Sequence, residues 1–272
     1  MSYYKGKRVL ITGAGSGIGE LMAMELGKRG AEVIVTARRI EAAREVVKQI
    51  RSLGGRATPM VLDVSDLQSI PAFRDQVHKE AGPLDILINN AGVVFGGTFE
   101  QVPLEDHLNT FQINSLGLMA MCHAFMDDLI ASKQSHLINI ASASSFVGLP
   151  YGSTYAASKW AVLGFSESLR LELKERGIKH LAVTTVCPSY ISTGMFDGVR
   201  NPLLSPMLTP EKVVHSVLRG AKNRESLVFE PLTVRAIDLL KGALPRPIWD
   251  EVAMRSGIAS SMKSWQGKGT KH

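Results

Sequence analysis

Short apolar segments alternate with longer segments of helical periodicity along most of the chain, and this alternation restricts the folds that it can adopt. The short segments are rich in Val, Ile and Leu on both faces, which is typical of parallel strands covered by helices on both sides. They cover residues 8–12, 32–37, 57–62, 85–89, 136–141, 181–187 and 226–229. The expected helices cover 17–29, 41–53, 66–81 behind a Ser65 cap, 104–130 and 155–176, with another beginning at Thr209.

This alternation predicts an α/β fold with a doubly wound, seven-stranded parallel sheet and helices on both faces. No low-complexity linker divides the 272 residues, so we expect a single domain over 1–272. Its core spans 6–230, and residues 231–272 form a C-terminal helical extension.

The composition is that of a globular protein with a substantial core, since 45% of the residues are hydrophobic and 21% are charged. The formal net charge of +6 favours anionic partners such as nucleotide phosphates, nucleic acid or an acidic membrane surface. The basic residues are spread out, so we expect no nucleic-acid partner. The Cys and His residues are not clustered, so we expect no metal site. The two cysteines cannot form a disulfide framework, and we expect neither a signal sequence nor a membrane-spanning segment. The cytoplasm is therefore the expected compartment.

A glycine-rich turn follows the first expected strand and opens the first expected helix. The N–H groups and the dipole of a helix N-terminus attract a pyrophosphate, and bare glycine backbone lets the phosphates approach. The spacing departs from the strict Gly-x-Gly-x-x-Gly fingerprint, but its place within a βαβ unit favours a dinucleotide and hence a Rossmann fold. The expected contacts are Gly13, Gly15, Ser16, Gly17, Ile18 and Gly19.

The end of the second expected strand indicates which dinucleotide is bound. An acidic residue at this position would take the ribose 2′-hydroxyl of NAD, but the sequence here has Arg38 and Arg39. Two guanidinium groups suit a 2′-phosphate, so NADP(H) is favoured over NAD(H), with Arg38 as the main contact. The alternative is that both arginines are surface residues at the start of a helix.

Further motifs follow in order at the ends of the later strands. They are Asp63-Val64, Asn89-Asn90-Ala91-Gly92, Asn114 in the long helix, Ser142, and Tyr155-Ala156-Ala157-Ser158-Lys159. Over about residues 6–230 the chain resembles the short-chain dehydrogenase/reductase family, which implies an NAD(P)-dependent oxidoreductase acting on CH–OH groups. The resemblance places Asp63 and Val64 at the adenine ring and Asn90, Ala91 and Gly92 along the cofactor groove. It makes Asn114, Ser142, Tyr155 and Lys159 the catalytic group.

The loop after the sixth strand matches the family in part. Pro188 is followed by Ser189 where the family often has glycine, while Thr193, which in the family touches the nicotinamide carboxamide, is present. The resemblance implies that Pro188, Ile191 and Thr193 contact the cofactor. Ser16 stands where NADP-using members often have a basic residue, so the NADP prediction depends on the two arginines. Residues 192–196 and the Leu/Pro-rich stretch after them resemble the branch that holds retinol and 17β-hydroxysteroid dehydrogenases.

The catalytic residue types suit hydride transfer with proton transfer. Tyr155 and Lys159 are four residues apart, so they lie on one face of a helix. A nearby ammonium favours the phenolate, so we expect Lys159 to lower the pKa of Tyr155. Ser142 would donate a hydrogen bond to the substrate oxygen. By resemblance, Lys159 would also bind the nicotinamide ribose and Asn114 would hold a water.

Apolar side chains dominate the loops at the carboxyl ends of the strands, which predicts a small hydrophobic alcohol or carbonyl compound as substrate. Residues 189–208 are expected to form a lid over it. The alternative is that these side chains close the core or an oligomer face. The family often pairs through its helices, so a homodimer or homotetramer is expected.

Two alternatives remain open on the sequence alone. Residues 232–249 form either an amphipathic basic helix in peripheral contact with a membrane or a segment packed on the protein, and Pro245 and Pro247 would break a long helix. The second concerns function: a dinucleotide-binding regulatory or scaffold protein with little turnover is the alternative to an enzyme.

Overall fold

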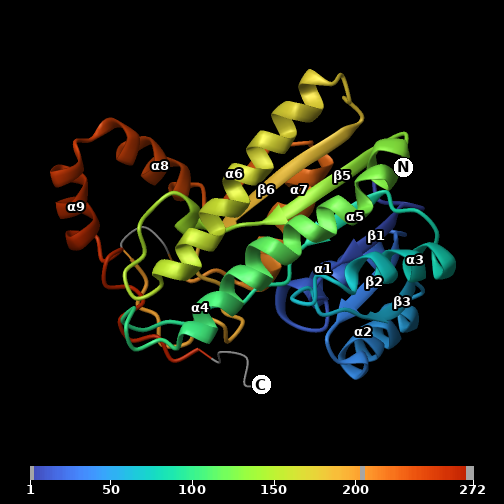
Figure 1. Cartoon of the computed structure of the whole chain (residues 1–272), viewed down its shortest axis with the longest axis horizontal. Helices are drawn as coiled ribbons and strands as arrows, with labels where there is room; N and C mark the ends of the chain where they lie inside the picture. The colour runs from blue at the N-terminus through green and yellow to red at the C-terminus, as the bar shows by residue number, and fades with distance from the viewer. Residues whose placement is uncertain (1–2, 203–205, 268–272) are drawn as a thin grey trace.

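A single parallel sheet forms the centre of the computed structural model, which describes residues 3–202 and 206–267 (Figure 1). The strands lie in the order β3-β2-β1-β4-β5-β6-β7, and all pair in parallel. Their bounds are β1 (Arg8–Ile11), β2 (Glu32–Ala37), β3 (Arg56–Val61), β4 (Ile86–Asn89), β5 (Ser135–Ile140), β6 (Leu181–Pro188) and β7 (Leu227–Glu230). The doubly wound α/β fold predicted from the sequence is confirmed.

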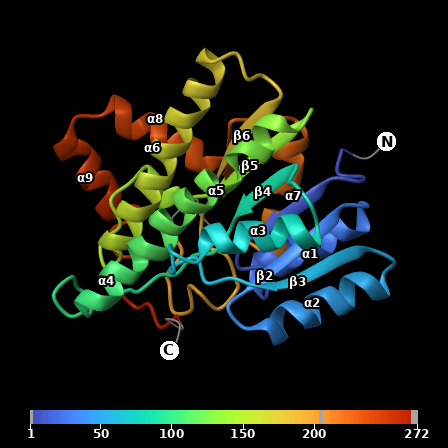
Figure 2. The ribbon, with the colours of Figure 1, turned by 45° about the vertical axis from the view of Figure 1, so that its right-hand side comes forward.

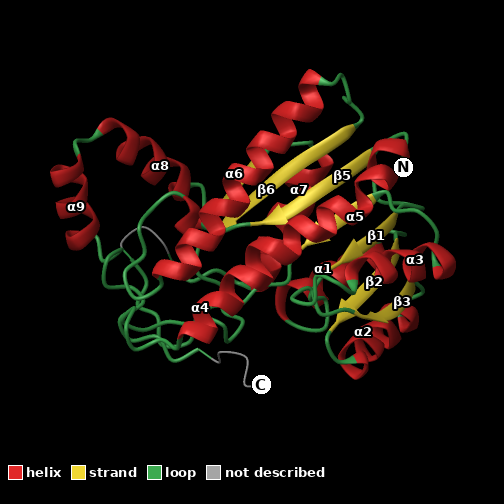
Figure 3. Cartoon of the chain, in the orientation of Figure 1, coloured by secondary structure: helices red, strands yellow, loops and turns green. Residues whose placement is uncertain are grey.

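Helices cover both faces of the sheet (Figures 2 and 3). One face carries α1 (Gly17–Lys28), α2 (Ile40–Ser52) and α7 (Pro210–Lys222), and the other carries α3 (Ile70–Glu80), α4 (Leu104–Phe111), α5 (Leu118–Ala131) and α6 (Ser153–Glu175). Each layer has its own apolar core. Leu26, Ile50 and Val217 pack in the first, and Phe73, Phe125 and Val162 pack in the second. The sheet therefore buries apolar side chains on both faces, as its continuous apolar strands require.

The expected helix over 104–130 is interrupted. A π-helical turn, Gln112–Gly117, separates α4 from α5. Gly117 lies tightly against the chain after β3, because a Cβ there would be 2.4 Å from the carbonyl oxygen of Val64. Amphipathic periodicity continues through such a turn, so the pattern did not reveal it.

The third helix begins later than predicted, and Ser65 does not cap it. α3 starts at Ile70, while the Ser65 hydroxyl donates to the carboxylate of Asp63 at 2.6 Å. The short polar side chains favour this local turn over a helical start. Other predicted boundaries differ from the observed ones by one or two residues, which is usual for element ends.

The C-terminal extension forms two helices, α8 (Thr233–Ala243) and α9 (Arg246–Arg255), which break at Pro245 as the prolines predict. They lie beside the carboxyl end of the sheet, at the left of Figure 1. Across the described ranges, none of the helices combines the length and the apolar character needed to cross a membrane.

Candidate active site

The loops after β1 and β4 lie side by side at the carboxyl edge of the sheet, where the direction of winding reverses. Thr12 joins them: its hydroxyl accepts the backbone N–H groups of Asn90 at 2.9 Å and Ala91 at 3.0 Å. The Asn90 side chain in turn donates to the carbonyls of Thr12 at 2.9 Å and Gly13 at 3.1 Å. Ligands bind at such switch points in open α/β sheets. Sequence reasoning missed Thr12, although it directly precedes the glycine turn.

Two glycines of the turn, Gly15 and Gly19, have no room for a side chain. A Cβ on Gly19 would lie 2.4 Å from the carbonyl oxygen of Gly13, and one on Gly15 would lie 2.9 Å from the Cβ of Ala37. Gly13 has a φ of +63°, which favours glycine. Ser16 makes no side-chain cap at the start of α1, so the first-turn N–H groups suit an anion. These features fit the pyrophosphate of a dinucleotide.

Residues predicted to hold the adenosine half lie at the ends of β2 and β3. Arg38 and Arg39 are exposed directly after β2. Beyond β3, the carboxylate of Asp63 accepts the backbone N–H of Ser65 at 2.9 Å, and Val64 is buried behind it. Because β2 and β3 are paired, with Ala37 opposite Val61, the residues that follow them lie at the same edge of the sheet.

The predicted catalytic side chains converge at the end of β5. Ser142 follows this strand, and its hydroxyl accepts the N–H of Ser144 at 3.1 Å and is also hydrogen-bonded to the Tyr155 side chain. Lys159 lies one turn further along α6, with Nζ 5.9 Å from the centroid of the Tyr155 ring. Its ammonium donates to the carbonyl of Ile140 at 2.9 Å. The structure thus brings Ser142, Tyr155 and Lys159 together.

Asn114 is buried within the π-helical turn and braces the chain after β4. Its Oδ1 accepts the N–H of Val93 at 2.8 Å, and its Nδ2 donates to the carbonyl of Val93 and to the hydroxyl of Ser158, each at 3.0 Å. A Cβ on Gly92 would lie 3.2 Å from this Oδ1 and 3.5 Å from the Lys159 Nζ. Asn114 therefore positions the Gly92–Val93 backbone beside Lys159, and its role in holding a water stays a prediction.

The pKa of Tyr155 differs from the sequence-based expectation. Burial raises it to about 12, and the hydrogen bond from Ser142 lowers it by less. Burial also lowers the pKa of Lys159 to about 8. Desolvation disfavours the charged form of both groups, so the expected lowering of the phenol pKa by its neighbour is wrong for the chain alone. At neutral pH the tyrosine keeps its proton.

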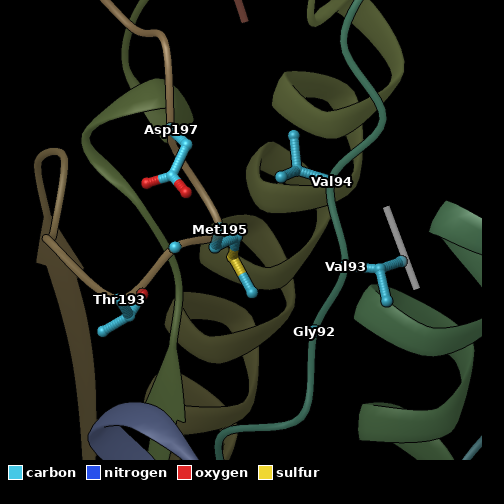
Figure 4. Close-up of a pocket in the computed structure, with 7 residues that line it drawn as sticks. Gly92, Val93, Val94, Thr193, Met195 and Asp197 are labelled. Carbon is cyan, nitrogen blue, oxygen red and sulfur yellow. The ribbon is translucent and has the colours of Figure 1, made fainter. Parts of the chain in front are cut away.

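A cavity of about 270 Å³ separates the loop after β4 from the loop after β6. Figure 4 shows Thr193 and Asp197 on one side, Gly92, Val93 and Val94 on the other, and the Met195 side chain directed between them. Of the three predicted contacts in the second loop, Thr193 lines this cavity, while Pro188 and Ile191 are buried. Ile191 instead pairs with Leu208.

A second, smaller cavity of about 50 Å³ adjoins Tyr155. Its lining combines residues after β5, the loop after β6 and the C-terminal extension: Ser142, Ala143, Ser144, Val147, Leu149, Tyr155, Ser189, Tyr190, Phe196, Pro202, Val234, Ile237, Ile258 and Ser261. The expected lid, 189–208, supplies part of this wall, and 203–205 lie outside the described residues. Sequence reasoning did not place the C-terminal extension here; the apolar side of 232–249 was the available signal.

The sequence model of the short chain dehydrogenase family matches residues 7–203. The chain belongs to this family. Mouse epidermal retinol dehydrogenase 2 is 37% identical over 246 residues, which are 88% of this chain and 79% of the mouse protein. Rat estradiol 17-beta-dehydrogenase 11 is 30% identical over 255 residues, which are 93% of this chain and 85% of the rat protein.

Solved short-chain dehydrogenases share the fold. A short-chain dehydrogenase/reductase from Burkholderia phymatum in complex with NAD superposes with a TM-score of 0.81 at 22% identity, covering 95% of this chain and 98% of that one. A metagenomic short-chain oxidoreductase in complex with NADP superposes with a TM-score of 0.71 at 30% identity, covering 83% and 96%.

The predicted family, and within it the branch of retinol and 17β-hydroxysteroid dehydrogenases, is confirmed. This short-chain dehydrogenase is an oxidoreductase acting on CH–OH groups, which favours an enzyme over a regulatory or scaffold protein.

Proposed function

We propose that this short-chain dehydrogenase interconverts a hydrophobic alcohol and its aldehyde or ketone with NADP(H), using Tyr155 as the general acid and base. One observation carries the proposal. The hydroxyl groups of Tyr155 and Ser142 meet in a cavity that is otherwise lined mainly by apolar side chains, with Lys159 buried one turn away. Such a cavity excludes water and leaves few groups to orient a substrate oxygen.

The chain's own groups handle the oxygen and its proton, while the nicotinamide supplies or accepts the hydride when it is bound. In reduction, Tyr155 donates its proton to the carbonyl oxygen, and Ser142 holds that oxygen by a hydrogen bond. The ammonium of Lys159, held by Ile140, stabilises the negative charge that then develops on the phenol. Asn114 keeps the backbone of Val93 in place.

The substrate class can be tested with purified protein and NADPH. The relatives named for retinol and estradiol support a hydrophobic substrate, as do the apolar side chains around Tyr155. We expect long-chain, retinoid and steroid carbonyl compounds to be reduced with higher kcat/KM than sugars, measured by the loss of NADPH absorbance. A preference for sugars would contradict the proposal.

Arg38 is proposed to determine the choice of dinucleotide. Arg38→Ala should weaken NADPH binding about tenfold or more and leave NADH binding within about twofold, because only NADPH carries a 2′-phosphate for the guanidinium. Dissociation constants for both dinucleotides, measured by calorimetry, check this. Arg44→Ala, which removes an exposed arginine within α2, serves as the control. Equal losses for the two dinucleotides would contradict the assignment.

We also propose that the protein assembles as a homodimer or homotetramer in the cytoplasm. Exposed apolar side chains on α4 to α6, namely Leu104, Leu108, Leu116, Trp160 and Leu171, support a subunit interface. Exposed Leu239, Ile248 and Met254 on α8 and α9 support peripheral contact with a membrane by the extension. Light scattering after gel filtration measures the number of subunits and so tests the interface between them. Sedimentation with vesicles tests the membrane contact.

A further inference from the structure

The residues that follow α9 fold back across the loop after β6. The backbone N–H of Gln266 donates to the carbonyl of Asp197 at 2.7 Å. Gly198 lies tightly against the same segment, because a Cβ there would collide with the carbonyl oxygen of Ser264. Residues 261–267, which we call the C-terminal strap, are therefore attached to the loop that forms one wall of the larger cavity.

Trp265, within this strap, contacts both loops beside that cavity. Its indole Nε1 donates to the carbonyl of Met195 at 3.0 Å, and its ring covers Gly96 so closely that a Cβ there would lie 2.8 Å from the ring. Met195 lines the cavity from the loop after β6. Gly96 follows, by two residues, Val94 on the opposite wall (Figure 4). Trp265 is thus a bridge between the two walls.

The loop after β6 has little in its own sequence to fix its shape. Gly194 and Gly198 have φ angles of +84° and +80°, and glycine is the residue whose backbone is least restricted. Between these glycines, the carbonyls of Met195 and Asp197 both accept hydrogen bonds from the strap. The strap therefore restricts a segment that would otherwise have considerable freedom.

We propose that Trp265 is a positioning residue for the reaction, which keeps Thr193 and Met195 across the cavity from Val94 before the ligands bind. The inference rests on the proposed function and on the expected contact of Thr193 with the nicotinamide. Without the bridge, the loop would have to be ordered at the moment of binding. That cost is the same in the ground state and the transition state, so affinity should fall while kcat is largely kept.

The position of Trp265 allows this role to be separated from a role in folding. The residue packs against a small cluster that includes Tyr155, Tyr190 and Phe196, apart from the two apolar cores that cover the sheet. We therefore expect its replacement to change the thermal midpoint little.

Binding and kinetics of two substitutions at this position test the proposal. Trp265→Ala should raise the dissociation constant of NADPH, measured by calorimetry, and the KM for retinaldehyde by about tenfold each, with kcat within about threefold. Trp265→Phe keeps a ring over Gly96 and loses only the hydrogen bond to Met195, so its losses should be about threefold.

Gly96→Ala tests the bridge from the other wall. The added methyl group would displace the Trp265 ring, so it should weaken binding about as much as Trp265→Ala does. In the Trp265→Ala background the same change should cost nothing further, because the ring that it would meet is gone. Gly148→Ala is the matched control: it lies in the loop after β5, and a Cβ there would meet nothing within 4 Å.

The outcomes separate this inference from the proposed function. Unchanged NADPH binding and KM in Trp265→Ala, or additive losses in the double variant, would overturn the bridge and leave the proposed function standing if the wild type reduces retinaldehyde. A clearly lower thermal midpoint in Trp265→Ala, Trp265→Phe and Gly96→Ala would also overturn it, by assigning the strap to folding. A wild type that binds NADPH but reduces no hydrophobic carbonyl compound would overturn the proposed function, while calorimetry would still decide whether Trp265 supports the binding of NADPH.

Discussion

Tyr155→Phe is expected to lower kcat for carbonyl reduction by about a thousandfold, within the range that general acid catalysis contributes. The substitution removes the hydroxyl whose proton the carbonyl oxygen receives and keeps the ring, which packs edge-on against Phe196 with the centroids 6.0 Å apart. Binding of NADPH should persist. Steady-state kinetics and calorimetry on the same preparation measure both quantities.

Tyr190→Phe is the matched control for this substitution. Tyr190 is also buried, lines the same cavity and packs edge-on against Phe196, but its hydroxyl bonds to Ser261. Its loss should change kcat far less than the loss of the Tyr155 hydroxyl. If both variants kept wild-type kcat, Tyr155 could not be the proton donor.

Lys159→Met should combine a large loss of activity with a gain in stability. The loss, about a hundredfold or more in kcat, follows from removing the charge that stabilises a developing phenolate. The gain follows from burial: Lys159 is 5% exposed, and its pKa falls to about 8 from an ordinary 10.5. Folding therefore disfavours the charged side chain, and a methionine of similar length avoids that penalty.

The stability gain depends on pH in a defined direction. Below pH 8 the lysine is charged in both the folded and the unfolded wild type, so the penalty is fully present. Between pH 8 and 10.5 the folded wild type releases the proton while the unfolded chain keeps it, which stabilises the folded wild type. The difference in thermal midpoint between variant and wild type should therefore shrink from pH 7 to pH 10.

Lys174→Met, on the exposed surface of the same helix, should show no such trend. A lower thermal midpoint for Lys159→Met at pH 7 would show that the hydrogen bond from Lys159 to Ile140 outweighs the cost of burial.

The sheet and the glycine-rich turn could be predicted because their causes are local. Continuous Val and Ile runs such as Glu32–Ala37 have few alternatives to a covered parallel strand, and the glycines cluster where the first helix must begin. Ser142, Tyr155 and Lys159 were predicted through the resemblance to the short-chain dehydrogenase/reductase family, and helical spacing added that Tyr155 and Lys159 share one face of α6. The assignment of the whole chain to one domain stays a prediction.

Other features depend on contacts between distant segments, which periodicity does not encode. Thr12 matters because its hydroxyl meets the chain after β4, and Ser261 matters because the C-terminal segment folds back to Tyr190. The pKa of Tyr155 was misjudged for the same reason. Helical spacing shows that a lysine is near, but only the packed structure shows that the phenol is desolvated.

The irregular turn at Gln112–Gly117 holds Asn114 against Val93 by changing the phase of the helix there. Removing one residue from it would favour a regular helix, in which the segments on either side rotate by about 100° relative to each other. Every side chain of the catalytic group would still be present in such a sequence, yet Asn114 would face elsewhere. Motif searches would accept that chain, so the spacing within this turn is a criterion for function that residue identity alone does not supply.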